Sequence, residues 1–402
     1  MGNKLIKKVR KSNKIFPFYY GFSLDLMFWA AMSTLFLTNV KKFNASEINS
    51  LTAISIITCV FGYFIALKII KKIGNLKSIR IGNILLLIAS LLITFPKSYY
   101  GVLIGFVFYQ YAFLFKSIDN VLLRNNLKFL GEEDKFFKYQ SKGTLIYSLM
   151  TLVIAFIAGY LFNINNYLPM YISIFYCFIN VFLTFFICEA SINLDEKKKE
   201  KERFKFNKAI IFILLFQFLI AALIDIGQTN SKLFLQYNMA EFLNVKKVVL
   251  NLSIIIFISR IFRVVSNVFF NKFYNKLQKY LPVILNTLLI LSFASVLIGN
   301  LIKNGYIGIA IMSFGFMIYL SIRDTTENYG RTILFSSCEE KYHDDVAIYF
   351  SLVRKIGDFL FSLVVSIILL KLSMKYAFIF LLVMSIVSLY VTINIYKIAK
   401  KV

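Results

Sequence analysis

Acidic residues stand inside several long apolar segments of the sequence, where a charged group needs an explanation. Asp25 and Asp225 each lie within such a segment, and Asp119, Asp324 and Glu327 lie toward segment ends. Placing an aspartate at the centre of a membrane helix costs about 2.5–3.5 kcal/mol on insertion scales. Because burial changes how readily a carboxyl group binds a proton, we expect Asp25 or Asp225 to carry a coupling proton. The alternative is a structural acid that is hydrogen-bonded to a neighbouring helix.

The polar residues of segment 209–235 and its continuation gather on one side of a predicted helix. At about 100° per residue they fall within a sector of roughly 120°. Its members are Gln217, Asp225, Gln228, Thr229, Lys232 and Gln236. Such a face predicts a wet cavity, or else a network of interhelical hydrogen bonds of about 0.6 kcal/mol each. Adding polar and aromatic residues of other segments, the candidate contacts to a substrate are Trp29, Tyr109, Gln110, Gln217, Gln228, Thr229 and Arg260.

A further set of charges lies where apolar segments end. The pairs Arg323–Glu327, Glu327–Arg331 and Arg354–Asp358 have the i,i+4 spacing that brings side chains together on a helix. We interpret these charges as a salt-bridge network at the inner gate of a transport path, with the members Asp119, Arg263, Arg323, Asp324, Glu327, Arg354 and Asp358. For Asp119 we expect an ion pair with Lys116. Arg260 either joins the gate or contacts an anionic group of the substrate.

The elements that position these residues are predicted from apolar runs of about 18–25 residues, a length that spans a bilayer as a helix. Of the 402 residues, 59% are hydrophobic and 16% charged, against about 45–50% and 25% in soluble domains. The runs do not alternate polar and apolar residues as barrel strands do. We therefore predict an all-α integral membrane protein with twelve transmembrane helices. They span residues 15–38, 48–70, 79–96, 99–123, 143–163, 167–188, 209–235, 247–269, 281–302, 305–327, 349–370 and 376–397.

The net charge of +26 is explained by basic loops between membrane helices. It does not predict nucleic-acid binding. Most lysines and arginines fall in alternate loops, which the positive-inside rule places in the cytoplasm. We therefore expect both termini to be cytoplasmic, in a multi-pass protein of the plasma membrane. The basic start followed by an apolar run is read as the first helix, because no small-residue cleavage site follows.

Metal and cofactor chemistry has no support in the residue pattern. The cysteines are scattered without a CxxC pair, and His343 is the only histidine. Neither a histidine-based metal site nor an intramembrane histidine relay is expected. We expect no cofactor.

A charged stretch at 189–208 divides the chain into two sets of six predicted helices. We expect pseudo-symmetric bundles at 1–188 and 209–402, joined by a cytoplasmic loop that serves as a solvated linker or, alternatively, as a regulatory segment. Faint internal similarity supports the duplication: Ser117-Ile118-Asp119 and Ser321-Ile322-Arg323 are 204 residues apart. Repeats of this kind place a substrate site near the membrane midplane between the halves.

Six plus six helices, a charged central loop and internal duplication together resemble the major facilitator superfamily across nearly the whole chain. The loop signature of that family falls at residues 67–77. Gly74 and Lys72 match it, whereas Leu67 replaces the first glycine, Lys71 the acid, and Asn75-Leu76 the basic pair. The resemblance implies a secondary transporter with rocker-switch alternating access. It also implies that helices 1, 4, 7 and 10, which carry the embedded acids, line the central cavity.

The function that these observations predict is proton-coupled efflux of an amphipathic small molecule. Proton-coupled uptake of a nutrient or small polar metabolite is the alternative. A membrane sensor or lipid-modifying protein is a third reading, but no nucleophile–histidine pair or phosphate loop supports an enzyme. We expect a monomer whose partners are a small-molecule substrate, protons and the lipid bilayer.

Overall fold

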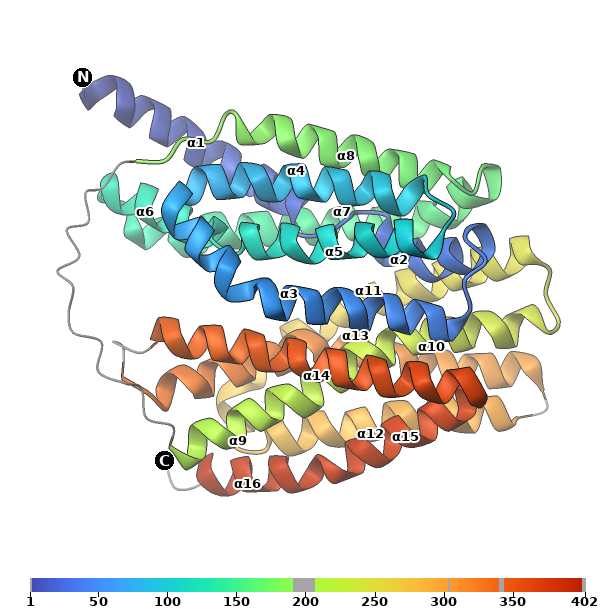
Figure 1. The fold of residues 1–402 in the computed structure, drawn as a ribbon. Coiled ribbons are helices and arrows are strands. Elements are labelled where there is room, and N and C mark those ends of the chain that lie inside the picture. The colour runs from blue at the N-terminus through green and yellow to red at the C-terminus, as the bar shows by residue number, and fades with distance from the viewer. Residues whose placement is uncertain (1, 191–206, 303, 340–342, 400–402) are drawn as a thin grey trace. The chain divides into compact units, whose positions relative to one another are not determined.

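The computed structural model describes residues 2–190, 207–302, 304–339 and 343–399. Within these residues the chain is helical and has no strand (Figure 1). The first part contains α1 (Gly2–Ser23), α2 (Trp29–Leu35), the π-helix η1 (Phe36–Val40), α3 (Ala45–Ile73), α4 (Asn75–Thr94), α5 (Tyr99–Lys116), α6 (Asp119–Phe129), the 3-10 helix η2 (Glu133–Lys135), α7 (Phe136–Ile164) and α8 (Leu168–Thr184). The second part contains α9 (Lys208–Phe216), the π-helix η3 (Gln217–Ala221), α10 (Ala222–Ala240), α11 (Val245–Leu277), α12 (Leu281–Leu301), α13 (Gly305–Ser336), α14 (His343–Lys371), α15 (Met374–Val387) and α16 (Leu389–Ala399).

Asparagine side chains cap several helix starts. Asn44 and Glu47 form a reciprocal capping box before α3, in which each side chain accepts from the backbone N–H of the other at 2.8–2.9 Å. Asn244 accepts from the N–H of Lys247 at the start of α11. These bonds satisfy amides that have no partner within the helix, and so they fix where the long helices begin.

In the part of the chain that the structure describes, nine helical stretches are long and apolar enough to cross a membrane. They are Ala45–Ile73, Asn75–Thr94, Tyr99–Phe129, Glu133–Ile164, Lys208–Ala240, Val245–Phe270, Leu281–Leu301, Gly305–Ser336 and Met374–Lys397. The other three predicted ranges are helical too. However, the first is interrupted and begins basic, α8 has 17 residues, and α14 carries the charges Arg354, Lys355 and Asp358. The total of twelve membrane crossings stays a prediction.

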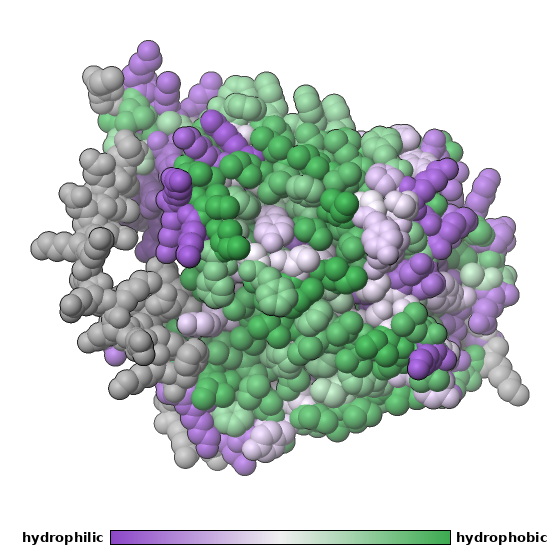
Figure 2. Space-filling model, viewed as in Figure 1, coloured by the Kyte–Doolittle hydropathy of each residue, from purple (hydrophilic) through white to green (hydrophobic). Residues whose placement is uncertain are grey.

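Large apolar side chains cover the outer flanks of these helices. Phe61 on α3 is 78% exposed, Ile164 at the end of α7 is 76% exposed, and Val268 on α11 is 63% exposed. In Figure 2, hydrophobic side chains cover the flanks of the helices on the visible face. Apolar surface on this scale is unfavourable in water and is what lipid contact requires.

The chain divides into two compact units. Unit 1 comprises residues 1–36 and 58–201, and unit 2 comprises residues 37–57 and 202–402. Residues 37–57, which fall in the first predicted bundle, therefore group with the second unit. The predicted six-plus-six arrangement itself stays a prediction, and residues 191–206 of the predicted central loop lie outside the described part.

In unit 1, α4 lies beside α5 and α8, and α1 packs against α7 (Figure 1). The α1–α7 contact is close because glycines meet there. A Cβ on Gly21 would lie 3.0 Å from the carbonyl oxygen of Gly143, and a Cβ on Gly143 would lie 3.2 Å from the carbonyl oxygen of Pro17. Small residues of this kind let membrane helices approach backbone to backbone.

In unit 2, α10 contacts α11, α13, α14 and α15, and α12 packs along α13. Buried rings fill the space between them: Phe293 lies 5.1 Å from Tyr319 and 6.1 Å from Phe378, measured between ring centroids. The charged side chains of unit 2 described below project from the same helices.

Residues 37–57 are held in unit 2 by polar side chains. Asn49 and Asn230 exchange amide hydrogen bonds of 2.9 and 3.1 Å. The hydroxyls of Ser46 and Ser366 each donate to the other's backbone carbonyl at 2.9 Å. All four residues are buried, and a buried polar group without a partner costs about 1–3 kcal/mol. These pairs therefore specify one register between α3, α10 and α14.

Residues 188–190, at the start of the charged stretch, form hydrogen bonds with unit 1. Glu189 accepts from the Asn75 side chain at 2.8 Å and from the Leu76 N–H at 3.1 Å, at the start of α4. Asn126 donates to the carbonyl of Cys188 and accepts from the N–H of Ala190, both at 2.8 Å. The Glu189 carboxylate thus occupies the positive end of α4, whose preceding Gly74 offers no side-chain cap.

Candidate functional site

The first predicted helix is interrupted where Asp25 stands. The range 15–38 was expected to be continuous, but α1 ends at Ser23 and α2 begins at Trp29. Neighbouring helices satisfy the freed backbone groups: the Lys116 ammonium donates to the Ser23 carbonyl, and the Ser173 hydroxyl accepts from the Phe28 N–H at 3.1 Å. Irregular backbone at membrane depth is tolerated only when it is satisfied in this way.

Asp25 itself is half-buried in this break and is held by two donors. Tyr109 of α5 donates its hydroxyl to Asp25 Oδ1 at 2.7 Å, and the N–H of Leu26 donates to the same oxygen at 2.7 Å. The Tyr109 ring in turn lies 4.9 Å from the Phe113 ring. The structure therefore brings together two residues that the sequence pointed to separately, the carboxyl of Asp25 and the ring of Tyr109.

Trp29 lies in the core of unit 1. It is 8% exposed, and its ring meets the edge of Phe106 at a centroid distance of 5.6 Å. The expected contact between Trp29 and a substrate therefore stays a prediction for which this packing offers no support. Gln110, the neighbour of Tyr109, is half-buried on α5.

A second break separates α5 from α6. The helix α5 ends at Lys116 and α6 begins at Asp119, and both residues are buried. The Tyr19 hydroxyl donates to Asp119 Oδ1 at 2.9 Å and accepts from the Asn83 side chain at 3.1 Å. The Asp119 carboxylate also lies in the first turn of α6, where the helix dipole favours a negative charge.

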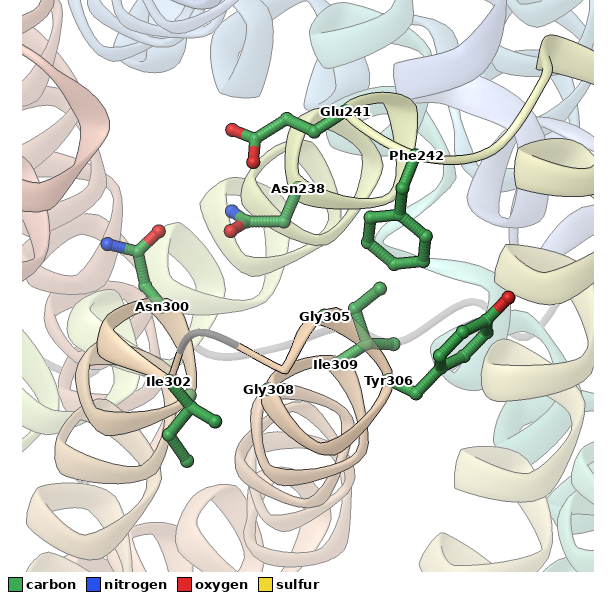
Figure 3. A pocket seen from close by; sticks show the side chains of 10 residues that line it. Asn238, Glu241, Phe242, Asn300, Ile302, Gly305, Tyr306, Gly308 and Ile309 are labelled. Atoms are coloured by element: carbon green, nitrogen blue, oxygen red, sulfur yellow. The ribbon is translucent and has the colours of Figure 1, made fainter.

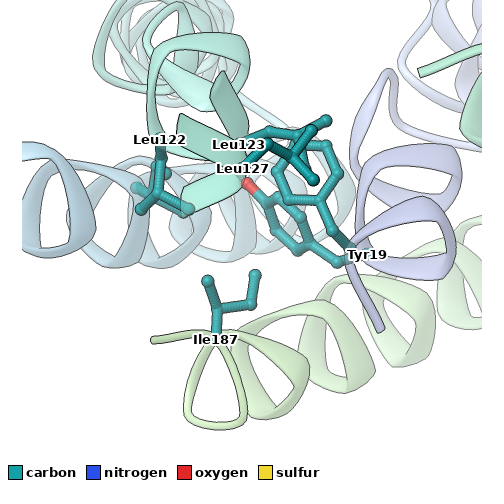
Figure 4. Packing of buried hydrophobic residues seen from close by; sticks show 7 residues of the cluster. Tyr19, Leu122, Leu123, Leu127 and Ile187 are labelled. Atoms are coloured by element: carbon teal, nitrogen blue, oxygen red, sulfur yellow. The ribbon is translucent and has the colours of Figure 1, made fainter. Parts of the chain in front are cut away.

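Figure 4 shows the apolar packing around Tyr19, in which Leu122, Leu123 and Leu127 of α6 and Ile187 surround the ring. Within this packing, the hydroxyl of Tyr19 is the polar atom that reaches Asp119. Tyr19, Asn83 and Ser173 were not predicted, because each lies on another helix and no local spacing marks it.

Lys116 connects the two breaks of unit 1. It ends α5, donates to the carbonyl at the end of α1, and interacts electrostatically with Asp25 and Asp119. The expected ion pair between Lys116 and Asp119 thus takes another form, in which the ammonium bonds to Ser23 and the carboxylate to Tyr19. One buried cation lies between two carboxylates at adjacent interruptions of the helices.

In unit 2, Asp225 lies in a network of ion pairs. Arg354 of α14 donates from Nε at 3.0 Å and from Nη2 at 2.6 Å to Asp225 Oδ2, and from Nη1 at 3.0 Å to Glu327 of α13. Arg323 of α13 lies 3.4 Å from Asp225 Oδ1. These contacts join α10, α13 and α14. We call Asp225, Arg323, Glu327 and Arg354 the Asp225 network.

These ion pairs differ in part from the i,i+4 pairs that were expected within single helices. Glu327 does pair with Arg331, at 2.7 Å. Arg323 and Arg354, however, reach across to α10, because Asp225 faces both of them. Asp358, the expected partner of Arg354, is half-buried on α14 and interacts with it electrostatically.

A second ionic contact joins α11 to α13. Arg263 donates to both oxygens of Asp324, at 2.7 and 2.5 Å, and Asn267 donates to the same carboxylate at 2.6 Å. The two parallel bonds give the fork geometry that arginine forms with carboxylates. Arg260, one turn before Arg263, is buried.

The residues of the polar face predicted for α10 and η3 do not share one environment. Some are half-buried, and others are buried or hydrogen-bonded to another helix. Gln228 and Thr229 are half-buried, and Thr229 donates to the backbone carbonyl of Asp225 at 3.3 Å. Gln236 donates to the Thr38 hydroxyl at 2.5 Å. Gln217 is buried in η3. Part of this face therefore makes hydrogen bonds between helices, the second of the two readings considered for it.

The profile of the Major Facilitator Superfamily matches residues 15–328. The chain belongs to the major facilitator superfamily. Membership identifies it as a multi-pass membrane transporter and not an enzyme. A search of curated protein sequences finds no match.

Solved structures of other superfamily transporters share this fold. The nucleoside transporter NupG is similar with a TM-score of 0.76 at 13% identity, over 96% of this chain and 99% of that one. A D-xylose-proton symporter has a TM-score of 0.68 at 11% identity, over 96% and 97%. A bacterial homologue of the human lysosomal transporter Spinster, solved inward-facing and unoccupied, has a TM-score of 0.65 at 9% identity, over 97% of both chains. At these low sequence identities, the similarity shows a shared fold and nothing about the substrate.

Proposed function

We propose that this superfamily transporter couples the movement of a small polar solute to protons, and that Asp25 carries the proton. The observation that supports it is the position of Asp25, half-buried in a helix break, where it accepts from the Tyr109 hydroxyl and the Leu26 N–H and interacts electrostatically with Lys116. Interrupted helices supply binding groups for substrates and ions in many secondary transporters.

Asp225 suits a structural role better than a proton-carrying one. Two arginines compensate its charge, with contacts of 2.6 and 3.4 Å. Protonation of Asp225 would remove the compensation that its charge gives to Arg323 and Arg354, two partly buried arginines, at a cost in free energy. We therefore assign proton coupling to Asp25 and assign the Asp225 network to holding α10, α13 and α14 together at a gate.

A polar solute is favoured over an amphipathic one for two reasons. Trp29, the largest aromatic candidate for stacking on an amphipathic ligand, packs against Phe106 in the core. The groups at the break of α1 are instead the hydroxyl of Tyr109 and the carboxyl of Asp25. The similar proteins include a nucleoside transporter and a D-xylose-proton symporter, which supports a hydroxyl-bearing solute.

Uptake driven by an inward proton gradient is the direction that we propose, with efflux of an amphipathic compound as the alternative. We also propose a monomer in the plasma membrane with both termini in the cytoplasm. In this mechanism a proton on Asp25 weakens its charge-assisted bond from Tyr109 and its attraction to Lys116. The break between α1 and α2 then becomes freer to rearrange as the solute is released.

Proteoliposomes test this proposal when an inward proton gradient is imposed and nucleosides, sugars and amphipathic cations are offered in turn. We expect a polar solute to accumulate with the wild-type protein. Asp25→Asn should abolish gradient-driven accumulation but retain exchange of labelled for unlabelled solute. Asp134→Asn, which changes an exposed acid of η2, is the matched control and should behave as wild type. Full accumulation by Asp25→Asn would refute the role of Asp25, and gradient-driven export of amphipathic cations alone would select the alternative.

A further inference from the structure

A cavity of about 410 Å³ lies in unit 2 where α10 and α12 end and α13 begins. Asn238 of α10 follows Asp225 by thirteen residues, which corresponds to about 20 Å along a helix. The cavity is therefore separate from the Asp225 network. Its volume falls within the roughly 300–1,000 Å³ of small-molecule sites.

The lining of this cavity has a polar side and an aromatic side (Figure 3). The carboxylate of Glu241 and the amides of Asn238 and Asn300 lie on one side, and the rings of Phe242 and Tyr306 lie on the other. The Asn238 amide nitrogen donates to the Phe234 carbonyl at 2.9 Å, so its oxygen is the atom that remains to accept from a ligand.

The helix ends around the cavity favour a cation. Both α10 and α12 terminate here, at Ala240 and Leu301, and helix C-termini carry partial negative charge on carbonyls that lack an intrahelical partner. The start of α13 would oppose them, but Asn304 caps it by accepting from the N–H groups of Tyr306 and Ile307 at 3.1 and 3.3 Å. The Glu241 carboxylate adds a full negative charge on the same side.

The aromatic pair provides a second attraction for a cation. The rings of Phe242 and Tyr306 meet at a centroid distance of 5.3 Å and an angle of 66°, and they are 41% and 71% exposed. The electron-rich face of such a ring attracts a cation even at an exposed site.

We propose that this cavity binds an organic ammonium ion that carries an apolar or aromatic group, at a site apart from the transport path. The ammonium group contacts Glu241 and the two carboxamides, and the apolar group lies against Phe242 and Tyr306. Close packing of Gly299 on Gly308 forms the base, where a Cβ on Gly299 would come within 2.5 Å of the Gly308 carbonyl oxygen. The base is therefore backbone, which leaves the volume open to the ligand.

Calorimetry on the full-length protein in detergent at neutral pH tests the site with benzylamine, present as the benzylammonium ion, as the probe. We expect saturable binding of this cation, with neutral benzyl alcohol and anionic benzoate at least tenfold weaker. Glu241→Gln and Tyr306→Leu should each weaken binding about threefold to tenfold, since each removes roughly 1 kcal/mol of attraction. Glu133→Gln, an exposed acid of unit 1, should leave binding unchanged.

A third variant, expected to bind the probe more tightly, keeps the test decisive if one of the first two fails to fold. Asn300→Asp adds a negative charge to the same side and should tighten binding of the probe. Unchanged affinity in Glu241→Gln, Tyr306→Leu and Asn300→Asp would place the probe elsewhere and overturn the proposal. Nanodiscs of phosphatidylglycerol and of phosphatidylcholine should give the same affinity. Loss of binding only in phosphatidylcholine would show that a lipid headgroup is the occupant and would overturn a soluble ligand.

Discussion

Replacing Arg354 by methionine tests whether the ion pairs of unit 2 hold its helices together. The guanidinium donates three hydrogen bonds to two carboxylates, at 2.6 to 3.0 Å, and its side chain is 18% exposed. The side chains of Asp225 and Glu327 are 21% and 32% exposed. Methionine keeps an unbranched apolar stem but removes all three bonds, so both carboxylates lose a partner.

The expected cost follows from the burial of that pair. Removing one partner of a buried salt bridge costs about 3–5 kcal/mol, because the other charge stays buried without compensation. Arg323 still lies 3.4 Å from Asp225 and retains part of the compensation. We therefore expect Arg354→Met to lower the free energy of unfolding by about 3 kcal/mol, at the lower end of that range.

Thermal or denaturant unfolding of the purified protein, followed by the fluorescence of the single tryptophan Trp29 and by size-exclusion chromatography, measures this loss. Arg331→Met is the matched control, since Arg331 pairs with the same Glu327 but its side chain is 57% exposed, and exposed pairs contribute about 0–1 kcal/mol. Adding Asp225→Asn to Arg354→Met should recover part of the stability, because it removes the uncompensated charge. If Arg354→Met is no more destabilising than Arg331→Met, or if Asp225→Asn recovers nothing, the reasoning is refuted.

Two further predictions concern unit 1. Lys116→Met removes the donor to the Ser23 carbonyl, at a cost of about 1–3 kcal/mol, and should speed amide hydrogen exchange in α2. Exchange as slow as in Lys128→Met, which changes an exposed lysine of α6, would contradict this. Gly143→Val places a Cβ 2.8 Å from the Tyr20 ring and should lower stability in thermal unfolding by about 1–3 kcal/mol through overpacking. The neighbouring exposed Thr144→Val should change it by less than about 0.5 kcal/mol, and equal effects of the two would exclude a close α1–α7 crossing.

Apolar run length predicted the nine helical stretches of the described residues that are long enough to cross a membrane, because each backbone must satisfy its own hydrogen bonds in lipid. The predicted ranges 48–70 and 247–269 begin after the observed starts of α3 and α11, which lie directly behind the capping residues Asn44 and Asn244. The charges of unit 2 were predicted to gather because Arg323, Asp324 and Glu327 are close in sequence. Arg263 of α11 was predicted to join this network, whereas Asp225 of α10 was not, since a helix can turn any of its faces toward a neighbour.

The break at Asp25 was beyond the reach of sequence reasoning for a physical reason. Neither glycine nor proline stands between Ser23 and Trp29, so the local chain gives no signal for ending a helix. The break depends on Lys116 and Ser173, which lie 93 and 145 residues from their partners. Only the fold brings these donors and acceptors together, and the same long-range packing buries Trp29.

The close crossing of α1 and α7 bears on how the chain is made. The first helix begins with a basic stretch and is interrupted before Trp29, so it is a weak membrane anchor by itself. The helix it packs against, α7, is synthesised more than a hundred residues later, and the Ser173 hydroxyl that accepts from the N–H of Phe28 later still. During translation α1 is therefore without this packing partner until α7 has been made. Mutations at Gly21 or Gly143 would then reduce yield during biosynthesis even when the finished protein tolerates them.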